Sequence, residues 1–187
     1  MAAGGIGIEY GGNRDKMKKT FFAGKFNKTI TNGKLSLIND YRVPLAGNEE
    51  RFTFANEGNA INEDYYYIGT FYNEKASNGQ LTSSDCKQVV AAEIKLIDDC
   101  DLFCAYLDSE TELSLGTVVE LIYATIINKD ILIFYNKKEV GYDIKSEYWY
   151  PIIATEYLLE EKEKLTIVEV NDVKQIYEYL NSGRCGE

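Results

Sequence analysis

The chain has 187 residues, 45% of them apolar, and a formal net charge of −10 from 20 basic and 30 acidic side chains. This length is typical of one globular domain, and the negative charge disfavours a nucleic-acid backbone or an anionic membrane as partner. The sequence contains no histidine, which excludes serine–histidine triads and histidine-ligated metals, so any catalysis would rest on carboxylates, tyrosines, lysines or a thiolate.

The first sixteen residues are rich in glycine and match no phosphate-binding loop, because no strand precedes them and no Lys-Ser/Thr pair follows. We expect residues 1–16 to be a poorly ordered extension and residues 17–187 to form a single domain. The N-terminus lacks the basic and apolar regions of a signal peptide, and no apolar run reaches the ~18 residues of a membrane span. A cytoplasmic location without membrane contact is expected.

Strands and helices alternate along the rest of the chain. Enrichment in apolar, aromatic and β-branched residues predicts strands at 21–24, 65–68, 102–107, 131–135 and 165–170. Apolar periodicity and capping residues predict helices at 83–98, 117–127, 149–164 and 173–180, with Ser83 or Ser84 capping the first and Asp172 the last. This alternation predicts an α/β fold with a doubly wound, mostly parallel five-stranded sheet of the flavodoxin or Rossmann-like kind. Residues 27–64 give no clear pattern.

Cysteines at positions 86, 100, 104 and 185 are the remaining candidates for metal binding or redox chemistry. A metal site would require closer Cys-x-x-Cys pairs or histidines. Cys100 and Cys104 are therefore interpreted as small core residues, and neither a metal nor a cofactor is expected.

The most informative segment is the turn Ser114-Leu115-Gly116-Thr117, which follows a buried strand and opens a helix carrying Glu120. Ligands of open α/β sheets bind at the carboxyl ends of strands. Gly116 would let a ligand approach the backbone, and Thr117 would cap the helix or hold a carboxylate. Acids in a first helical turn often only complement the helix dipole. Glu120, however, has apolar neighbours, and a desolvated carboxylate is costly without a function.

Some of the other polar and aromatic residues are expected near Glu120, and others are assigned structural roles. Asp108 ends the buried strand near Glu120, whereas Asp101 at the strand entrance is interpreted as a structural cap or a solvated charge. Phe71 and Tyr72, after the strand at 65–68, are candidates for stacking on a ring of the ligand, whereas the strand tyrosines are assigned to the core on at least one face. Trp149 and Tyr150 would anchor a helix start or cover a neighbouring subunit's site.

These motifs resemble the nucleoside 2-deoxyribosyltransferase family. The resemblance is carried by Ser114, Gly116, Thr117, Glu120, Ala124 and Lys129 with the strand that follows, and by an apolar strand after Asp101. The run at 20–25 is similar to the family's first strand and glycine turn, and the run at 67–72 resembles a Tyr-x-Gly-Pro-Phe-Phe motif with Thr70 in place of proline. The resemblance spans most of residues 18–135.

The resemblance implies that Glu120 is a nucleophile that attacks the anomeric carbon of a 2′-deoxyribose and forms a glycosyl-enzyme ester. The family's proton-transferring acid, usually an aspartate, corresponds to Glu93, and Asp85 or Asp108 are alternatives. Substrate contacts would come from residues at the ends of the strands and in the turn: Phe21, Gly24, Gly69, Phe71, Tyr72, Ser114, Gly116 and Thr117. Phe21 stands where the family has a tyrosine that positions the nucleophile.

The implied function is therefore cleavage of the N-glycosidic bond of deoxynucleosides with base exchange, in nucleotide salvage, by a homo-oligomer. Ser114 stands where many members have aspartate and is similar to the branch that hydrolyses deoxynucleoside 5′-monophosphates, an alternative that stays open. Two further alternatives are a non-catalytic module that binds nucleotides or NAD derivatives, and a domain whose acidic surface binds a basic protein.

Overall fold

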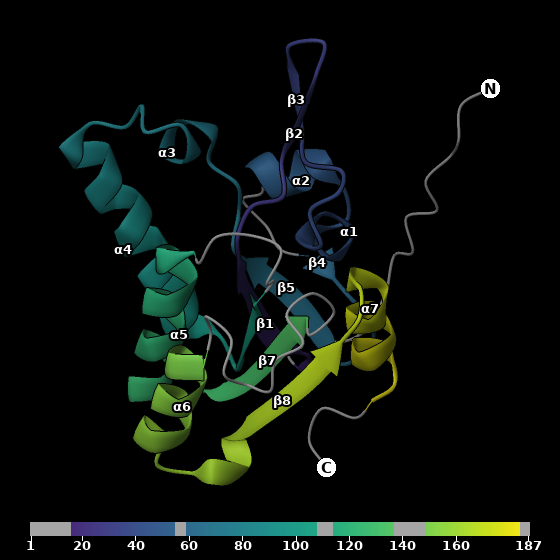
Figure 1. Ribbon diagram of the computed structural model, residues 1–187, viewed down its shortest axis with the longest axis vertical. Coiled ribbons are helices and arrows are strands. Elements are labelled where there is room, and N and C mark those ends of the chain that lie inside the picture. The colour runs from purple at the N-terminus through teal and green to yellow at the C-terminus, as the bar shows by residue number, and fades with distance from the viewer. Residues whose placement is uncertain (1–15, 55–58, 108–113, 137–148, 184–187) are drawn as a thin grey trace.

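The computed structural model describes residues 16–54, 59–107, 114–136 and 149–183 (Figure 1). Within these ranges a six-stranded sheet runs through the middle of the molecule, and a separate hairpin projects from it. The strands are β1 (Lys18–Gly24), β2 (Thr29–Thr31), β3 (Lys34–Ser36), β4 (Asn59–Ala60), β5 (Tyr65–Gly69), β6 (Leu102–Leu107), β7 (Asp130–Asn136) and β8 (Leu165–Val170). The helices are α1 (Arg42–Ala46), α2 (Glu49–Phe54), α3 (Glu74–Ser77), α4 (Ser83–Asp99), α5 (Leu115–Ile126), α6 (Trp149–Leu158) and α7 (Val173–Asn181).

The sheet has the order β4-β5-β1-β6-β7-β8, and all its neighbouring strands are parallel except β4 and β5. The predicted doubly wound, mostly parallel α/β fold is confirmed. The sheet has one strand more than expected, because β4 contains two residues and is too short to produce a sequence pattern. Without β4, the strands numbered in chain order read 2-1-3-4-5, which is the flavodoxin-like order.

Helices cover both faces of the sheet because successive strand residues point to opposite sides. Phe22 and Cys104 belong to a core cluster shared with α1, α2 and α7, whereas Phe21 and Phe103 belong to one shared with α4, α5 and α6. Figure 1 shows these two groups of helices on either side of the strands. Cys100 is also buried, so both cysteines assigned to the core lie there.

The helix boundaries differ from the predicted ones where side chains cap the ends. Thr82, rather than either serine, caps α4, and it forms a reciprocal capping box with Asp85. Helix α6 ends at Leu158, six residues before the predicted end at Lys164. The Lys162 ammonium donates a hydrogen bond of 2.7 Å to the Leu159 carbonyl, and residues 162–164 form a 3₁₀ turn instead of continuing the helix.

Residues 27–64, which showed no clear sequence pattern, contain the β2–β3 hairpin and the short helices α1 and α2. The hairpin turns at Asn32 and Gly33, which both have positive φ angles (54° and 74°), the conformation that a two-residue Asn-Gly turn adopts. Helices of five and six residues are too short to show apolar periodicity.

Most of the expected N-terminal extension lies outside the described residues, since the description begins at Lys16. Among the helices that the structure describes, none combines the length and apolarity needed to cross a bilayer.

Candidate functional site

The direction of chain winding reverses at β1, which has β5 on one side and β6 on the other. Open α/β sheets bind ligands at the carboxyl ends of the strands beside such a reversal. The carboxyl ends of β1 and β6 are in register, with Gly24 paired to Tyr106. Strand β6 leads through residues 108–113, which lie outside the described part of the chain, to Ser114 and α5. The topology therefore places the candidate site at the predicted edge, beside the start of α5.

Ser114 is the N-cap of α5, and its hydroxyl oxygen accepts a 3.4 Å hydrogen bond from the Thr117 backbone amide. Of the two residues that could cap this helix, the serine does so, while Thr117 is buried. Among the described residues, a β-carbon added at Gly116 would have the Ser114 hydroxyl as its nearest neighbour, at 3.9 Å. Within this part of the chain the backbone at Gly116 is open, so a ligand has room to approach it.

Glu120 lies in the second turn of α5, not in the first, because the helix begins at Leu115 instead of the predicted Thr117. The first turn of α5 contains no acidic residue. The interpretation of Glu120 as a helix-dipole partner therefore loses its basis, since that effect fades beyond the first turn. Glu120 is partly buried, beside the fully buried Leu121.

Glu93 and Glu120 interact, although they come from different helices, α4 and α5, which contact each other. Burial and, to a lesser extent, the negative charge of Glu93 raise the pKa of Glu120 to about 8, although Arg42 opposes the shift. Burial also raises the pKa of Glu93, and Arg42 again lowers it. Two carboxyl groups of this kind titrate as a pair. At neutral pH the pair retains a proton, so one member can donate it while the other carries a charge.

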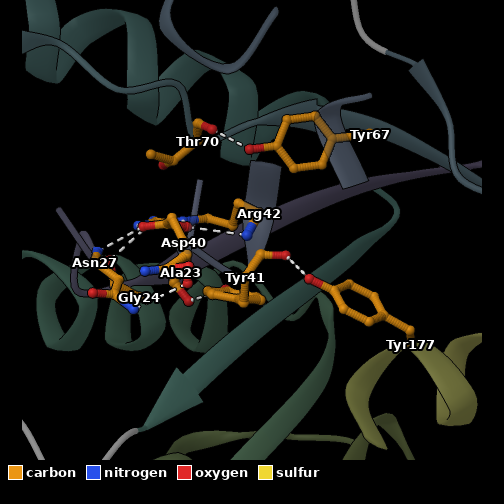
Figure 2. A network of polar contacts seen from close by, with 10 residues as sticks. Ala23, Gly24, Asn27, Asp40, Tyr41, Arg42, Tyr67, Thr70 and Tyr177 are labelled. Atoms are coloured by element: carbon orange, nitrogen blue, oxygen red, sulfur yellow. Dashed lines mark hydrogen bonds and ion pairs between the residues drawn. The ribbon is translucent and has the colours of Figure 1, made fainter. Parts of the chain in front are cut away.

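A second buried charge pair lies at the end of β1, where the Arg42 guanidinium binds the Asp40 carboxylate in a bidentate arrangement (Figure 2). The two bonds measure 2.9 and 3.0 Å, and both side chains are fully buried. Arg42 also donates a 2.9 Å hydrogen bond to the Gly24 carbonyl. Burial by itself lowers the pKa of Arg42, but Asp40 more than offsets this, so the net shift is upward.

Two predicted aromatic contacts, Phe21 and Tyr72, are buried rather than free for a ligand. Phe21 is 0% exposed and stacks on Phe103, with ring centres 5.5 Å apart. The position of the family's tyrosine therefore belongs to the apolar core here. Tyr72 is 3% exposed and packs edge-on against Phe26, whereas Phe71 is partly buried.

Gly24 and Gly69 are required for packing. A β-carbon at Gly24 would lie 3.0 Å from the Tyr41 ring, and one at Gly69 would lie 3.1 Å from Phe21. Both values are closer than ordinary van der Waals contacts, so a side chain would displace the residues that shape this edge.

The remaining predicted acids fall into two groups. Asp101 accepts a 2.8 Å hydrogen bond from the Lys19 backbone amide and is exposed, so its interpretation as a structural residue is confirmed. Asp85 is exposed, and its carboxylate accepts hydrogen bonds from Thr82 in the cap of α4. Asp108 lies outside the described residues. No cluster of three or more potential metal ligands occurs in the part of the chain that the structure describes.

Sequence reasoning missed Asp40 and Arg42, the most buried charged pair of this edge. The available signal was the Asp-x-Arg spacing followed by Pro44 in a chain with few prolines. Such spacing is common in exposed loops and did not distinguish a buried pair. Burial of Arg42 depends on Phe26 and Phe52, which come from different elements and meet only in the folded chain.

Comparison with known proteins finds similarity among solved structures. No protein-family model matches the chain, and no curated protein is similar to it. The chain is similar to the CMP N-glycosidase BcmB of Clostridium botulinum, at 18% sequence identity and a TM-score of 0.48, over 88% of this chain and 99% of that one.

Proposed function

We propose that this protein cleaves the N-glycosidic bond of 2′-deoxynucleosides, with Glu120 as the nucleophile and Glu93 as the group that transfers protons. The observation that carries the proposal is the pair of interacting, partly buried carboxyl groups on α4 and α5, two helices that contact each other and β1. Glycoside cleavage with retention needs two carboxyl groups, one ionised and one protonated. A pair that keeps a proton at neutral pH meets this requirement.

The reaction follows from the two roles. The Glu120 carboxylate attacks C1′ as the bond from C1′ to the base nitrogen breaks, and Glu93 gives its proton to that nitrogen. In the second step a free base or a water molecule attacks C1′, Glu93 takes up the released proton, and the ester to Glu120 breaks. Attack by a base gives exchange, and attack by water gives hydrolysis.

Burial by itself would place the proton of the pair on Glu120, whose pKa is about 8, whereas the proposed first step needs it on Glu93. The two arrangements differ only by transfer of the proton within the pair. The departing base offers Glu93 an acceptor for that proton, which favours the arrangement with an ionised Glu120 when substrate is bound. The resemblance of the Gly116-Thr117-x-x-Glu120 segment supports the same assignment.

The first test is chromatographic detection of free base from deoxyadenosine, deoxycytidine and deoxyadenosine monophosphate, each with and without an acceptor base. We expect product from the wild type and none from Glu120→Gln. Glu156→Gln, at an exposed glutamate of α6, is the matched control and should keep full activity. Full activity in Glu120→Gln would exclude Glu120 as the nucleophile.

One observation favours a 5′-monophosphate as the alternative substrate. The segment 25–39 leaves the carboxyl end of β1 with Lys25, Lys28 and Lys34 and contains no acidic residue, although the whole chain is acidic. A local positive charge would attract a phosphate group. Under this alternative the monophosphate is cleaved faster than the nucleoside, and Lys25→Ala reduces that preference. Equal rates for both substrates would contradict it.

Burial of Phe21 in the core favours a non-catalytic binding module, since the hydroxyl that positions the nucleophile in the resembled family is absent there. Calorimetry with nucleosides and nucleotides separates this function from catalysis. Tight binding without release of base would support the module, whereas turnover would exclude it.

We also propose that copies of the chain associate through a surface formed by α5 and α6, which pack together. Large apolar side chains are exposed there, including Tyr157 at 84%, Leu115 at 75% and Val119 at 65%. Scattered apolar residues are normal on a surface, but several on two helices that pack together favour an interface. A stable interface needs about 800 Å² from each partner. Leu115 and Val119 lie beside Gly116 and Glu120, so a partner here would border the site.

Light scattering tests this association. We expect the wild type to be an oligomer and Tyr157→Glu to shift it toward the monomer. Ile30→Glu, at a residue of the hairpin that is 72% exposed, is the control and should leave the mass unchanged. A monomeric wild type would contradict the proposal.

A further inference from the structure

The Asp40–Arg42 pair fixes the chain where it leaves β1. The Asp40 carboxylate accepts a 2.8 Å hydrogen bond from the Asn27 backbone amide, and Arg42 binds the Gly24 carbonyl. The pair therefore holds both ends of the Gly24–Asn27 segment at the switch point (Figure 2). Phe26, within this segment, lies under the guanidinium, with its ring centre 4.3 Å from the guanidinium carbon.

The Arg42 guanidinium is surrounded by the Asp40 carboxylate and by aromatic rings. The rings of Tyr41 and Phe52 each lie 5.3 Å from its central carbon. With Asp40 on one side and aromatic rings around it, Arg42 has no access to water to screen its charge. A charge in such surroundings acts over longer distances than an exposed one.

The positive charge of Arg42 acts on the two carboxyl groups of the candidate site. Arg42 lowers the pKa of both Glu93 on α4 and Glu120 on α5, against the effect of burial. Helices α4 and α5, which carry the two glutamates, both contact β1, the strand whose last carbonyl, that of Gly24, binds Arg42. Tyr41 and Tyr67 also interact with Arg42, but burial raises the pKa of both phenols, and they stay neutral through the physiological range.

We propose that Arg42 is a positioning residue of the site: held by Asp40, it orders the Gly24–Asn27 segment and sets the pH range over which the Glu93–Glu120 pair carries one proton. The inference rests on the proposed function for its catalytic meaning. Its electrostatic part concerns the free protein and can be measured without any turnover.

The test compares two substitutions that break the same ion pair and leave opposite charges behind. In Arg42→Gln the cation is lost, so we expect the pKa of Glu120 to rise by about one unit. In Asp40→Asn the cation loses its counterion, so we expect a smaller fall. A residue that served only to hold the structure would give no such opposite shifts.

The primary measurement is a ¹³C NMR titration of the side-chain carboxyl carbons of glutamate in the full-length protein without substrate. Asp130→Asn is the matched control, because it breaks the exposed Lys18–Asp130 pair and should leave Glu120 unchanged. If Arg42→Gln does not fold, Arg42→Lys replaces it. The lysine keeps the charge, so we expect the pKa of Glu120 to stay near the wild-type value while Asp40→Asn lowers it.

The second measurement is the pH dependence of kcat/KM on a substrate that the wild type cleaves. Both limbs of the profile should move to higher pH in Arg42→Gln and to lower pH in Asp40→Asn. Shifts of Glu120 in the same direction in both variants, or no shift in either, would overturn the inference. A protein that shows the opposite NMR shifts but cleaves no substrate would contradict the proposed function and leave the electrostatic role of Arg42 established.

Discussion

Two pairs of charged side chains, Asp40–Arg42 and Glu93–Glu120, differ in whether their members attract or repel each other and in how deeply they are buried. Asp40 and Arg42 have opposite charges, are fully buried and are hydrogen-bonded to each other and to the backbone. Glu93 and Glu120 are both acidic and partly buried; burial favours the protonated form of each, and the charge of Glu93 adds to this effect on Glu120.

The comparison shows what a scaffold and a reactive group each require. A buried ion pair with good geometry is rigid and does not change its protonation near neutral pH. A pair of partly buried carboxyl groups is held in a state that costs stability and can give up or accept a proton. The positive charge of Arg42, which does not change near neutral pH, lowers the pKa of both Glu93 and Glu120.

The largest expected effect concerns the reactive pair. Glu120→Gln removes the nucleophile but keeps the size of the side chain, and kcat should fall on the order of 10⁴-fold or more. Glu93→Gln removes the proton donor and should reduce kcat by about 10²–10⁴-fold, with the smaller loss for bases that leave easily. Steady-state kinetics on a series of leaving bases measure both. Equal losses for all bases in Glu93→Gln would contradict its role as the acid.

The next largest effect concerns the satisfied pair. Arg42→Met leaves the buried Asp40 carboxylate without a cationic partner, so the free energy of unfolding should fall by about 3–5 kcal/mol. Lys18→Met breaks the exposed Lys18–Asp130 contact of 3.5 Å and should change it by less than about 1 kcal/mol. Urea denaturation compares the two variants. Similar losses in both would mean that the buried pair has no special role in stability.

The pH dependence of the reaction also distinguishes the Glu93–Glu120 pair from the Asp40–Arg42 pair. The Glu93–Glu120 pair needs one proton, and the last proton leaves Glu120 near its pKa of about 8. We expect a bell-shaped profile of kcat/KM whose alkaline limb lies close to pH 8. Activity that continues to rise above pH 9 would show that the cleavage step does not use a proton from this pair.

The smallest expected effect concerns how the free energy of unfolding depends on pH. Between its usual pKa of 4.5 and about 8, Glu120 is protonated in the folded chain but ionised in the unfolded chain. The folded state then binds more protons, so this group's contribution to stability falls as pH rises through that range. Glu120→Gln cannot ionise and should exceed the wild type in unfolding free energy by about 2 kcal/mol at pH 8, but not at pH 4.5. Thermal denaturation at both pH values measures this, and a variant less stable at pH 8 would contradict it.

Much of the fold was predictable because its central strands are continuous apolar runs. The strand predicted at 102–107 has the observed bounds, and the strands around it differ by a few residues at their ends. The β2–β3 hairpin and the helices α1 and α2 were not predictable, since elements this short depend on tertiary contacts rather than on a repeating pattern. Helix ends also moved where a side chain such as Thr82 or Lys162 supplied a cap.

Of the two charge pairs, sequence reasoning identified Glu93 and Glu120 as candidates but not Asp40 and Arg42. Glu120 follows a recognisable turn at the start of α5, and the family resemblance singled out Glu93 on α4. Asp40 and Arg42 gave no pattern, because what makes them important is complete burial among aromatic rings from separate elements. Phe21 is the opposite case: a motif predicted that it contacts the substrate, whereas in the structure it stacks on Phe103 in the apolar core.

The central claim is that Glu120 forms a covalent ester with the sugar while Glu93 moves the proton. Intact-mass spectrometry and peptide mapping of acid-quenched mixtures with deoxynucleoside test it directly, with Glu93→Gln included because it slows the second step. The account predicts a deoxyribosyl adduct on the peptide that contains Glu120, absent from Glu120→Gln. Turnover without any adduct, or an adduct on another residue, would contradict it.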